Sequence, residues 1–555
     1  MQRLRRHKAL LLAIAGGILF ALTSPPTDLY PAVFLGLALF AWSLEDAPTT
    51  WRAFGRGAAW ATAAGIVGLR FVPSVILRFT PLGSAASYLA LVLLAAGQSL
   101  IWAIGAATTH LVHRRARAPF VLAFAVGVFV AVSLPSVFAW TPAGLVSPWP
   151  ALVQLADLVG ERGVSVIFAV SAAFLARALQ AMLADDATTT KARFGAKTTV
   201  PLAIAAAIPA LLATYGALRM RFLSTQPSVV RTIRVALLNQ AVGPKERWDP
   251  KNHTAILRDL RRLTKDAEAG GVDLTVWPEA AYPYPLMHGT TQAPRGSRAV
   301  HGDGARGPIL FGLIMLEKPT ATSPGLVETN SRNSATLVLP DGSLQPSYDK
   351  LELLWFGETV PLGAYIPWLR RIFQASGGLV PGTEPTALVL PHADGSVRMG
   401  VLNCYEDTLA GVGLRITRAL QPNLLVNVTN DAWFVGTAEP ELHARLAAMR
   451  AIEHRLDLVR AVNLGVLSWI DARGVVVARD ASTSPSTLVA TPTLRDGSLT
   501  LYGRFGDKPL VFAFVAAIAA FAWRARRKGD GAKAGSKNET GASNEARAGS
   551  GETGA

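Results

Sequence analysis

Three residues in the second half of the chain are of types that carry out covalent catalysis. Cys404 is the only cysteine among 555 residues, so it has no disulfide partner within the chain. Such a thiol is either buried and inert or kept for its reactivity. Glu279 follows Pro278, and Lys350 precedes Glu358 by eight residues. Taken alone, the glutamate fits an ordinary surface acid and the lysine an ordinary solvated cation.

Together, these side chains could transfer an acyl group. A thiolate attacks an ester well and leaves well from a thioester. Glu279, with a pKa raised in a partly dry site, could take the thiol proton. Lys350 would supply positive charge where the tetrahedral intermediate develops an oxyanion, and losing one such donor typically costs roughly 10²–10³-fold in rate. Glu358 could hold that lysine protonated and correctly aimed.

Strands that end just before these residues would position them. Apolar runs and turn signals predict strands at 232–240, 272–277, 309–316, 334–339, 344–348, 399–402, 424–428, 459–470 and 475–478. Helical spacing of apolar residues predicts helices at 251–269 and 439–455. Pro278 cannot join a sheet ladder, which places Glu279 just past a strand end. We therefore expect an α/β domain over 230–505, with sheets flanked by helices.

The composition of the whole chain indicates a membrane protein. Half of the residues are apolar, only 17% are charged, and the mean hydropathy is +0.31. An ordinary globular chain carries about 25% charged residues. This excludes a single soluble domain and a chain that is mostly disordered. The single cysteine excludes a disulfide-stapled secreted scaffold.

The apolar residues divide the chain into further domains. Seven runs predict seven transmembrane helices within residues 1–222, at 9–24, 30–44, 57–72, 85–109, 119–138, 163–183 and 199–218. An eighth helix is predicted over 506–527, so the fold class is a polytopic α-helical membrane domain of about eight transmembrane helices plus the α/β domain. The polar segment 528–555 is predicted to be a disordered cytoplasmic tail.

Basic residues near the ends of the runs predict the orientation. One set of alternate ends holds sixteen Lys and Arg residues, and the opposite set holds only Arg70, Arg78 and Arg162. The positive-inside rule therefore predicts that both termini are cytoplasmic and that residues 230–505 lie across the membrane from them. Because each basic cluster abuts an apolar run, we interpret these clusters as topology anchors, and we expect no nucleic-acid partner.

Several short motifs resemble those of the nitrilase superfamily. They are Trp277-Pro278-Glu279, Tyr348-Asp349-Lys350, Phe356-Gly357-Glu358, Asn403-Cys404-Tyr405-Glu406 and Asn430-Asp431-Ala432-Trp433-Phe434. A nitrilase-like domain placed between seven apolar spans and an eighth is similar to the apolipoprotein N-acyltransferase family. That resemblance covers residues 1 to about 525.

The resemblance implies an α-β-β-α sandwich with a periplasmic active site in a bacterial inner membrane. It implies transfer of a fatty acyl chain from a phospholipid to the N-terminal amine of a diacylglyceryl-cysteine apolipoprotein. Cys404 would be the nucleophile, Glu279 the general base and Lys350 the oxyanion support, in a ping-pong mechanism. The supporting residues implied are Glu358, Tyr405, Glu406 and Trp248. We expect a monomer without cofactors.

The segment from Leu351 to Pro381 is rich in aromatic and aliphatic residues. It is predicted either to pack as ordinary core or to form a membrane-facing lid that admits a lipid tail, with Trp355, Phe356 and Trp368 as its anchors. Ser376-Gly377-Gly378 would serve as the hinge. His443 and His454 lack the spacing of a metal motif, so we predict no metal site.

Two other function classes stay open from the sequence. A membrane-tethered amidase or nitrilase would use the same three residues with water as the acceptor, and it would need no apolar lid. A non-catalytic scaffold or transporter would carry charged or broken-helix sites within its spans. Acidic residues inside the predicted spans are few, which disfavours the transporter.

Overall fold

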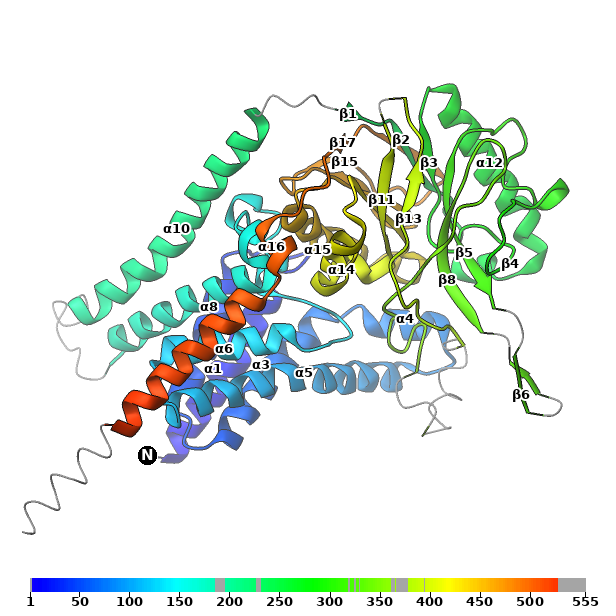
Figure 1. The fold of residues 1–555 in the computed structure, drawn as a ribbon. Helices are drawn as coiled ribbons and strands as arrows, with labels where there is room; N and C mark the ends of the chain where they lie inside the picture. Colours follow the sequence, from blue (N-terminus) through cyan, green and yellow to red (C-terminus); the bar gives the residue numbers. More distant parts are fainter. Residues whose placement is uncertain are drawn as a thin grey trace, which may run out of the picture.

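The structure is a computed structural model, and it describes residues 2–184, 195–225, 231–317, 320–323, 326–328, 330–360, 365, 378–393 and 395–527. A helical bundle forms the first part of the chain (Figure 1). Its helices are α1 (Gln2–Ala21), α2 (Ala32–Glu45), α3 (Thr50–Gly68), α4 (Val72–Phe79), α5 (Ser84–Arg114), α6 (Phe120–Ser133), α7 (Pro142–Leu145), α8 (Ala156–Met182) and α10 (Ala196–Thr225). The described chain ends in the helix Lys508–Arg527, and each of the eight predicted apolar runs lies largely on one of these helices.

Not all of these helices are long enough to cross a membrane alone. Among the described residues, four have the required length and apolar character: α5, α8, α10 and Lys508–Arg527. The bent pair α3 and α4, which meet at 58°, makes a fifth if it is one broken span. At 1.5 Å per residue, α2 and α6, with 14 residues each, fall short of a hydrocarbon core of about 30 Å. The predicted count of eight is therefore not confirmed.

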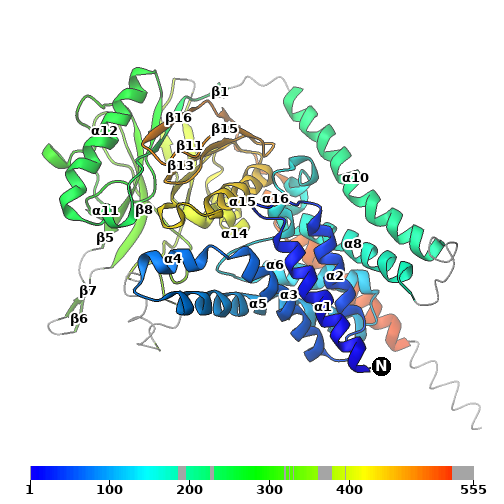
Figure 2. The same cartoon turned by 180° about the vertical axis from the view of Figure 1, so that it is seen from behind.

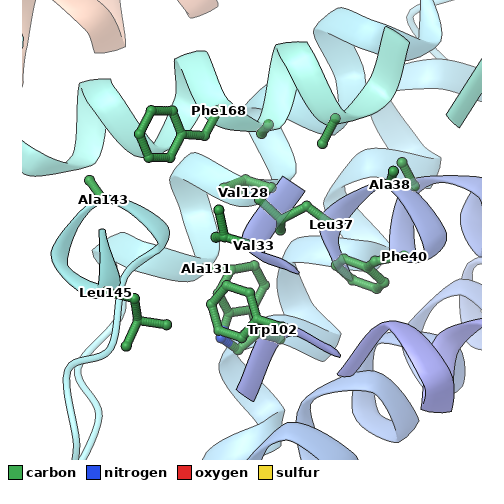
Figure 3. Close-up of a cluster of buried hydrophobic side chains, with 14 of the residues drawn as sticks. Val33, Leu37, Ala38, Phe40, Trp102, Val128, Ala131, Ala143, Leu145 and Phe168 are labelled. Carbon is green, nitrogen blue, oxygen red and sulfur yellow. The ribbon is translucent and has the colours of Figure 1, made fainter. Parts of the chain in front are cut away.

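The bundle packs around aromatic and small side chains. Figure 3 shows Phe40 of α2, Trp102 of α5 and Phe168 of α8 among the buried residues. Small residues let the helices approach closely; a Cβ on Gly105 of α5, for example, would collide with the backbone of Gly127 in α6. The same buried cluster includes Leu442, Leu446, Met449 and Ile452 from a helix of the following domain.

The second part of the chain contains two main sheets. The six-stranded sheet has the order β10 (Leu388–Leu390), β11 (Val397–Asn403), β12 (Leu424–Asn430), β13 (Leu458–Asn463), β14 (Leu467–Ile470) and β15 (Val476–Asp480). The seven-stranded sheet has the order β16 (Ser486–Ala490), β2 (Val235–Asn239), β3 (Leu274–Val276), β5 (Ile309–Leu316), β8 (Ser331–Val338) and β9 (Tyr348–Asp349), with β4 (Leu286–Met287) paired to β5. The remaining strands form two short pairs, β1 (Arg231–Thr232) with β17 (Thr493–Leu494), and β6 (Thr320–Ser323) with β7 (Leu326–Glu328).

The two sheets pack face to face, with helices on both outer faces (Figures 1 and 2). Helix α12 (His253–Ala269) covers the seven-stranded sheet, with α11 (Pro244–Arg247) just before it in the chain. Helices α14 (Ala410–Leu420) and α15 (Glu439–His454) cover the six-stranded sheet, and α15 also contacts α7 and α8 of the bundle. The short helix α16 (Leu501–Phe505) leads into the C-terminal helix. The expected α-β-β-α sandwich is confirmed.

Two predicted strands are wrong. Of the predicted strand 344–348, only Tyr348 lies in a strand, β9, and Leu344 forms an isolated bridge to Val338. The run 459–470 was expected to be a single strand, but it forms two antiparallel strands, β13 and β14. Leu464 adopts a positive φ of 52° between them, which reverses the chain. Asn463 and Gly465 flank Leu464 and give a turn signal within this run, although the residue in the left-handed region is the leucine itself.

Candidate active site

Cys404 lies directly after β11, at the start of the 3₁₀ turn Cys404–Thr408. Its φ of +55° is in the left-handed region, which is uncommon for a residue with a side chain and typical of strained functional positions. Its carbonyl oxygen accepts a hydrogen bond from Asn427 Nδ2 at 2.9 Å. The sharp turn places the sulfur at the end of a strand, as the sequence predicted.

Glu406 holds this turn against the loop that follows β9. Its carboxylate is fully buried and accepts hydrogen bonds from Tyr348 Oη at 2.6 Å and from the backbone N–H of Leu351 at 2.7 Å. It also accepts from the N–H groups of Glu352 at 3.0 Å and Asn403 at 2.7 Å. One carboxylate therefore fixes the nucleophile's turn and the chain around Lys350 relative to each other. Burial raises the pKa of Glu406 to about 7.

Lys350 lies between two carboxylates. Its Nζ is 2.8 Å from Glu358 Oε2 and 3.3 Å from Glu279 Oε1, and the residue is 1% exposed. Burial acts to lower the pKa of Lys350, but the charges of Glu279 and Glu358 outweigh it and raise that pKa well above its ordinary value. The lysine is therefore a permanent cation within the site.

Asn333, in the middle of β8, joins the two carboxylates from the other side. Its Nδ2 donates to Glu279 Oε1 at 2.6 Å and to Glu358 Oε1 at 2.7 Å. Its Oδ1 accepts from Asn403 Nδ2 at 3.1 Å, and Asn403 directly precedes the cysteine. Sequence reasoning missed Asn333. The available signal was a polar residue within a strand that is otherwise apolar towards its end.

Glu279 accepts hydrogen bonds from residues of both sheets. Its Oε1 accepts from Asn333 and Lys350 of the seven-stranded side, while its Oε2 accepts from the backbone N–H of Asn430, at the end of β12, at 3.0 Å. The residue is 7% exposed. Burial is the main cause that raises the pKa of Glu279, Lys350 opposes it, and Glu358 adds to it. A carboxylate with a raised pKa is suited to accept a proton near neutral pH.

The thiol is held in its neutral form. Burial raises the pKa of Cys404 well above its ordinary value, the charge of Glu279 raises it further, and Lys350 opposes both. A neutral thiol needs a base during the reaction, and Glu279 is the acid whose charge acts most strongly on it. The structure thus brings Glu279, Lys350, Glu358 and Cys404 into one buried site.

The other predicted residues lie at different distances from this site. The Tyr405 ring lies 5.5 Å from Lys350 Nζ, and its hydroxyl donates to Leu353 O at 3.1 Å. Trp248 is 56% exposed and stacks on Arg247, whose guanidinium donates to the carbonyl of Ala280, next to Glu279. No described contact joins Trp248 itself to the four central residues.

Only part of the predicted lid is described. Trp355 is 43% exposed, and Phe356 has a φ of +64°. Trp368 and the hinge residues Ser376 and Gly377 lie outside the described residues. Trp355 and Tyr405 line a cavity of about 400 Å³ that reaches the bundle helices α5 and α6 through Trp102 and Ala131.

A group of possible metal ligands lies near the site. The carboxylates of Asp431 and Glu439 and the imidazole of His443 have one ligand atom each within 4.8 Å of one another. Both ring nitrogens of His443 already contact carboxylates, Asp407 at 2.9 Å and Asp431 at 3.1 Å.

Comparisons with known proteins match both parts of the chain. The profile for the apolipoprotein N-acyltransferase N-terminal domain matches residues 16–174, and the carbon-nitrogen hydrolase profile matches residues 234–497. The apolipoprotein N-acyltransferase of Geobacter metallireducens is 29% identical, over 93% of this chain and 95% of its own length. The enzyme of the same name from Allorhizobium ampelinum is 27% identical, over 84% and 86% of the two chains.

A solved amidase of the nitrilase superfamily, from Nesterenkonia AN1, matches 52% of this chain and all of its own at 18% identity, with a TM-score of 0.33. The two profiles match in the same order as the helical bundle and the two-sheet domain, and the named relatives span nearly the whole chain. The chain is a bacterial membrane protein that belongs to the apolipoprotein N-acyltransferase family.

Proposed function

We propose that this protein transfers a fatty acyl chain from a phospholipid, through a thioester on Cys404, to the N-terminal amine of a diacylglyceryl-cysteine apolipoprotein. The observation that carries the proposal is the placement of Lys350 between Glu279 and Glu358 beside a neutral, half-buried thiol. This arrangement supplies a nucleophile, a base and a fixed cation. The family relationship supports the substrates.

In the first half-reaction, Glu279 takes the thiol proton as the sulfur attacks the ester carbonyl of the phospholipid. The Lys350 ammonium stabilises the oxyanion of the tetrahedral intermediate. As the C–O bond breaks, Glu279 returns the proton to the leaving alkoxide, and lysophospholipid departs. Cys404 is left as an acyl-thioester, and the charge of the site is unchanged.

In the second half-reaction, the amine of the apolipoprotein attacks the thioester. Glu279 accepts the proton that the amine loses, and Lys350 again stabilises the oxyanion. The C–S bond breaks, and the thiolate regains its proton from Glu279. The products are an amide and the free enzyme, which gives a ping-pong sequence with one base and one oxyanion donor.

The cavity beside Tyr405 supports a lipid donor. Its lining combines Trp355 and Tyr405 of the catalytic domain with residues from the middle of α5 and the C-terminal end of α6. An acyl chain that entered this cavity from the bilayer would lie between these two helices on one side and the catalytic domain on the other. We propose that Trp355 and Phe356 belong to a lid over this entrance, as the sequence analysis predicted.

The arrangement of the chain ends supports eight crossings with a periplasmic catalytic domain. Figures 1 and 2 show the N-terminus and the end of the helix Lys508–Arg527 at the same end of the bundle, away from the two sheets. The predicted basic clusters at both termini would then share the cytoplasmic side. The shorter helices α2 and α6 would cross with help from their flanking residues.

The proposed function is tested by the mass of a lipoprotein N-terminus. Cells that depend on this protein should produce triacylated lipoproteins, and cells carrying Cys404→Ala should accumulate the diacylated form with a free amine. A Ser396→Ala variant, on the exposed surface of the catalytic domain, serves as the control and should retain triacylation. Triacylated lipoproteins in Cys404→Ala cells would contradict the proposal, and hydrolysis of a small amide by the wild type without acylation would favour the amidase.

A further inference from the structure

A buried group of four charged side chains lies behind the nucleophile. We call it the His443 cluster, and its members are Asp407, Asp431, His443 and Arg460. No member is more than 4% exposed. None of them belongs to the acyl-transfer steps described above, so the cost of burying four charges needs a separate explanation.

His443 binds two carboxylates at once. Its Nε2 lies 2.9 Å from Asp407 Oδ1, and its Nδ1 lies 3.1 Å from Asp431 Oδ1. Arg460 Nε donates to the other oxygen of Asp407 at 2.9 Å. A ring nitrogen needs a hydrogen to bind an ionised carboxylate oxygen, so two carboxylate contacts favour His443 as an imidazolium with both nitrogens protonated.

The cluster is electrically balanced without a metal ion. Two carboxylates face one imidazolium and one guanidinium. Burial and the charge of Asp431 raise the pKa of the adjacent Glu439 to about 8, so that acid is neutral near pH 7. A cation bound to His443 would have to displace one of its two carboxylate contacts. The geometry therefore favours a structural charge cluster over a metal site.

The two carboxylates belong to the two turns that hold the reacting groups. Asp407 lies three residues after Cys404, in the same 3₁₀ turn. Asp431 directly follows Asn430, whose backbone N–H donates to Glu279 Oε2 at 3.0 Å. Through these two contacts, a single ring on α15 connects the turn of the nucleophile to the turn that clamps the base.

We propose that His443 is a positioning residue whose two carboxylate contacts set the geometry between the Cys404 thiol and Glu279. This inference rests on the proposed roles of those two residues. The helix α15 that carries His443 is itself fixed to the bundle, because Arg450 Nη2 donates to Glu161 Oε2 of α8 at 2.5 Å. The ring is thus held by a rigid element rather than by a loop.

The test compares His443→Gln with His454→Gln in the full-length protein. His454 lies on the same helix and is equally buried, but its ring faces Thr417 and not the His443 cluster. For His443→Gln, kcat for acyl-enzyme formation should fall roughly 10- to 100-fold while KM for phospholipid is unchanged. The control should match the wild type when rates are expressed per folded protein.

Alkylation of Cys404 by iodoacetamide gives a readout that needs no lipid. In the wild type, the pH midpoint of alkylation should lie above that of an ordinary thiol, because Glu279 and burial raise the pKa of Cys404. In His443→Gln, looser geometry should move that midpoint towards the ordinary value of about 8.5. Asp431→Asn should move it in the same direction, both because the contact to the Asn430 turn is weakened and because the charge of Asp431 itself raises the pKa of Cys404.

An unchanged midpoint and an unchanged kcat per folded protein in both variants would overturn the proposal. A chelator that alters the alkylation midpoint of the wild type would also overturn it, because the cluster would then hold a metal. If the wild type forms no acyl-enzyme, the proposed function fails, but the alkylation midpoints still decide the role of His443.

Discussion

At the scale of single residues, one side chain of the site holds a fixed positive charge, and other side chains can exchange a proton. Lys350 keeps its proton because two carboxylates contact it, whereas Cys404 keeps its proton because burial and Glu279 disfavour the thiolate. In the proposed reaction, the first proton that moves is therefore the one that passes from the thiol to Glu279. This arrangement keeps the resting thiol unreactive towards chance electrophiles.

Glu279→Gln should separate thiol reactivity from catalysis. Removing the negative charge lowers the pKa of Cys404, so alkylation by iodoacetamide at pH 8 should become faster than in the wild type. Acyl-enzyme formation from phospholipid should fall by roughly 10²-fold or more, because the base is lost. Both rates are measured on the same preparation. A variant that loses alkylation and acylation in parallel would show that Glu279 only supports the fold.

The pH dependence of stability reports on His443. Burial acts to lower the pKa of His443, but Asp407 and Asp431 outweigh it and raise that pKa to about 10 in the folded protein. A raised pKa contributes stability that is complete below the unfolded value of about 6.5 and is lost as the pH rises through the folded value. Between pH 7 and 9.5, the unfolding free energy should fall by up to about 1.4 kcal/mol per pH unit from this group.

Thermal unfolding in detergent across that pH range measures this slope. It should be shallower in His443→Gln and unchanged in His454→Gln, since burial lowers the pKa of His454 to about 3 and it does not titrate there. Equal slopes in the wild type and His443→Gln would show that the ring is neutral in the folded protein.

At the scale of secondary structure, strand ends and one broken helix position the site. Helix α8 changes direction at Gly160, which has a φ of +71°, and a Cβ there would collide with the ring of Tyr502. Directly after this break, the backbone N–H of Glu161 donates to Glu453 Oε1 at 2.7 Å. The break thus allows a bundle helix to bind α15 of the catalytic domain.

Gly160→Ala should destabilise the protein for two reasons, the positive φ and the collision with Tyr502. A loss of about 1–3 kcal/mol from backbone strain alone is expected, with a lower thermal midpoint in detergent. Gly55→Ala in α3 is the matched control, because no atom lies within 4 Å of the position that its Cβ would take and its backbone is helical. That variant should be neutral or slightly stabilising. Equal midpoints for the two variants would contradict the role given to Gly160.

The strand ends were largely predictable from the sequence, but the side-chain network was not. Apolar runs before Glu279 and Cys404 predicted β3 and β11, since buried parallel strands read as continuous apolar segments. Asn333 was missed because its partners are distant in sequence and become neighbours only when the sheets pack. The same holds for His443, which lacks a metal-binding pattern and pairs instead with two acids from separate turns.

At the scale of the whole molecule, the bundle and the catalytic domain share one apolar core. Leu442, Leu446, Met449 and Ile452 of α15 pack in the same cluster as the bundle helices. Buried charges reinforce this contact through Arg450, Glu161 and Glu453. The catalytic domain is therefore held at a fixed height over the membrane helices. A fixed height would suit the proposed function, in which the thiol meets a phospholipid ester near the bilayer surface.

The three arginines predicted on the catalytic side are occupied by protein partners. Arg70 donates to Pro25 O, Arg78 donates to Val435 O, and Arg162 pairs with Asp507 at 2.5 Å. These three arginines therefore take part in local structure. Near Arg78, the Phe79 and Trp433 rings contact each other at a centroid distance of 4.5 Å and join α4 to the catalytic domain.

Cysteine labelling tests this orientation. In a Cys404→Ser background, Ser396→Cys on the exposed surface of the catalytic domain should react with a membrane-impermeant maleimide in intact spheroplasts. Trp51 is 80% exposed and lies at the N-terminal end of α3, which the predicted orientation places on the cytoplasmic side. Trp51→Cys should therefore react only after lysis. The reverse pattern would overturn the proposed topology, because the catalytic domain would then face the cytoplasm.

The central claim is that Cys404 carries the acyl group, and the intact mass of the purified protein after incubation with phospholipid alone tests it most directly. Since Cys404 is the only cysteine, a hydroxylamine-labile addition of one acyl mass identifies the site without ambiguity. We predict that this addition forms in the wild type, disappears when a diacylglyceryl peptide is added, and never forms in Cys404→Ser. An unmodified Cys404 in a preparation that releases lysophospholipid and acylates the peptide would contradict the account.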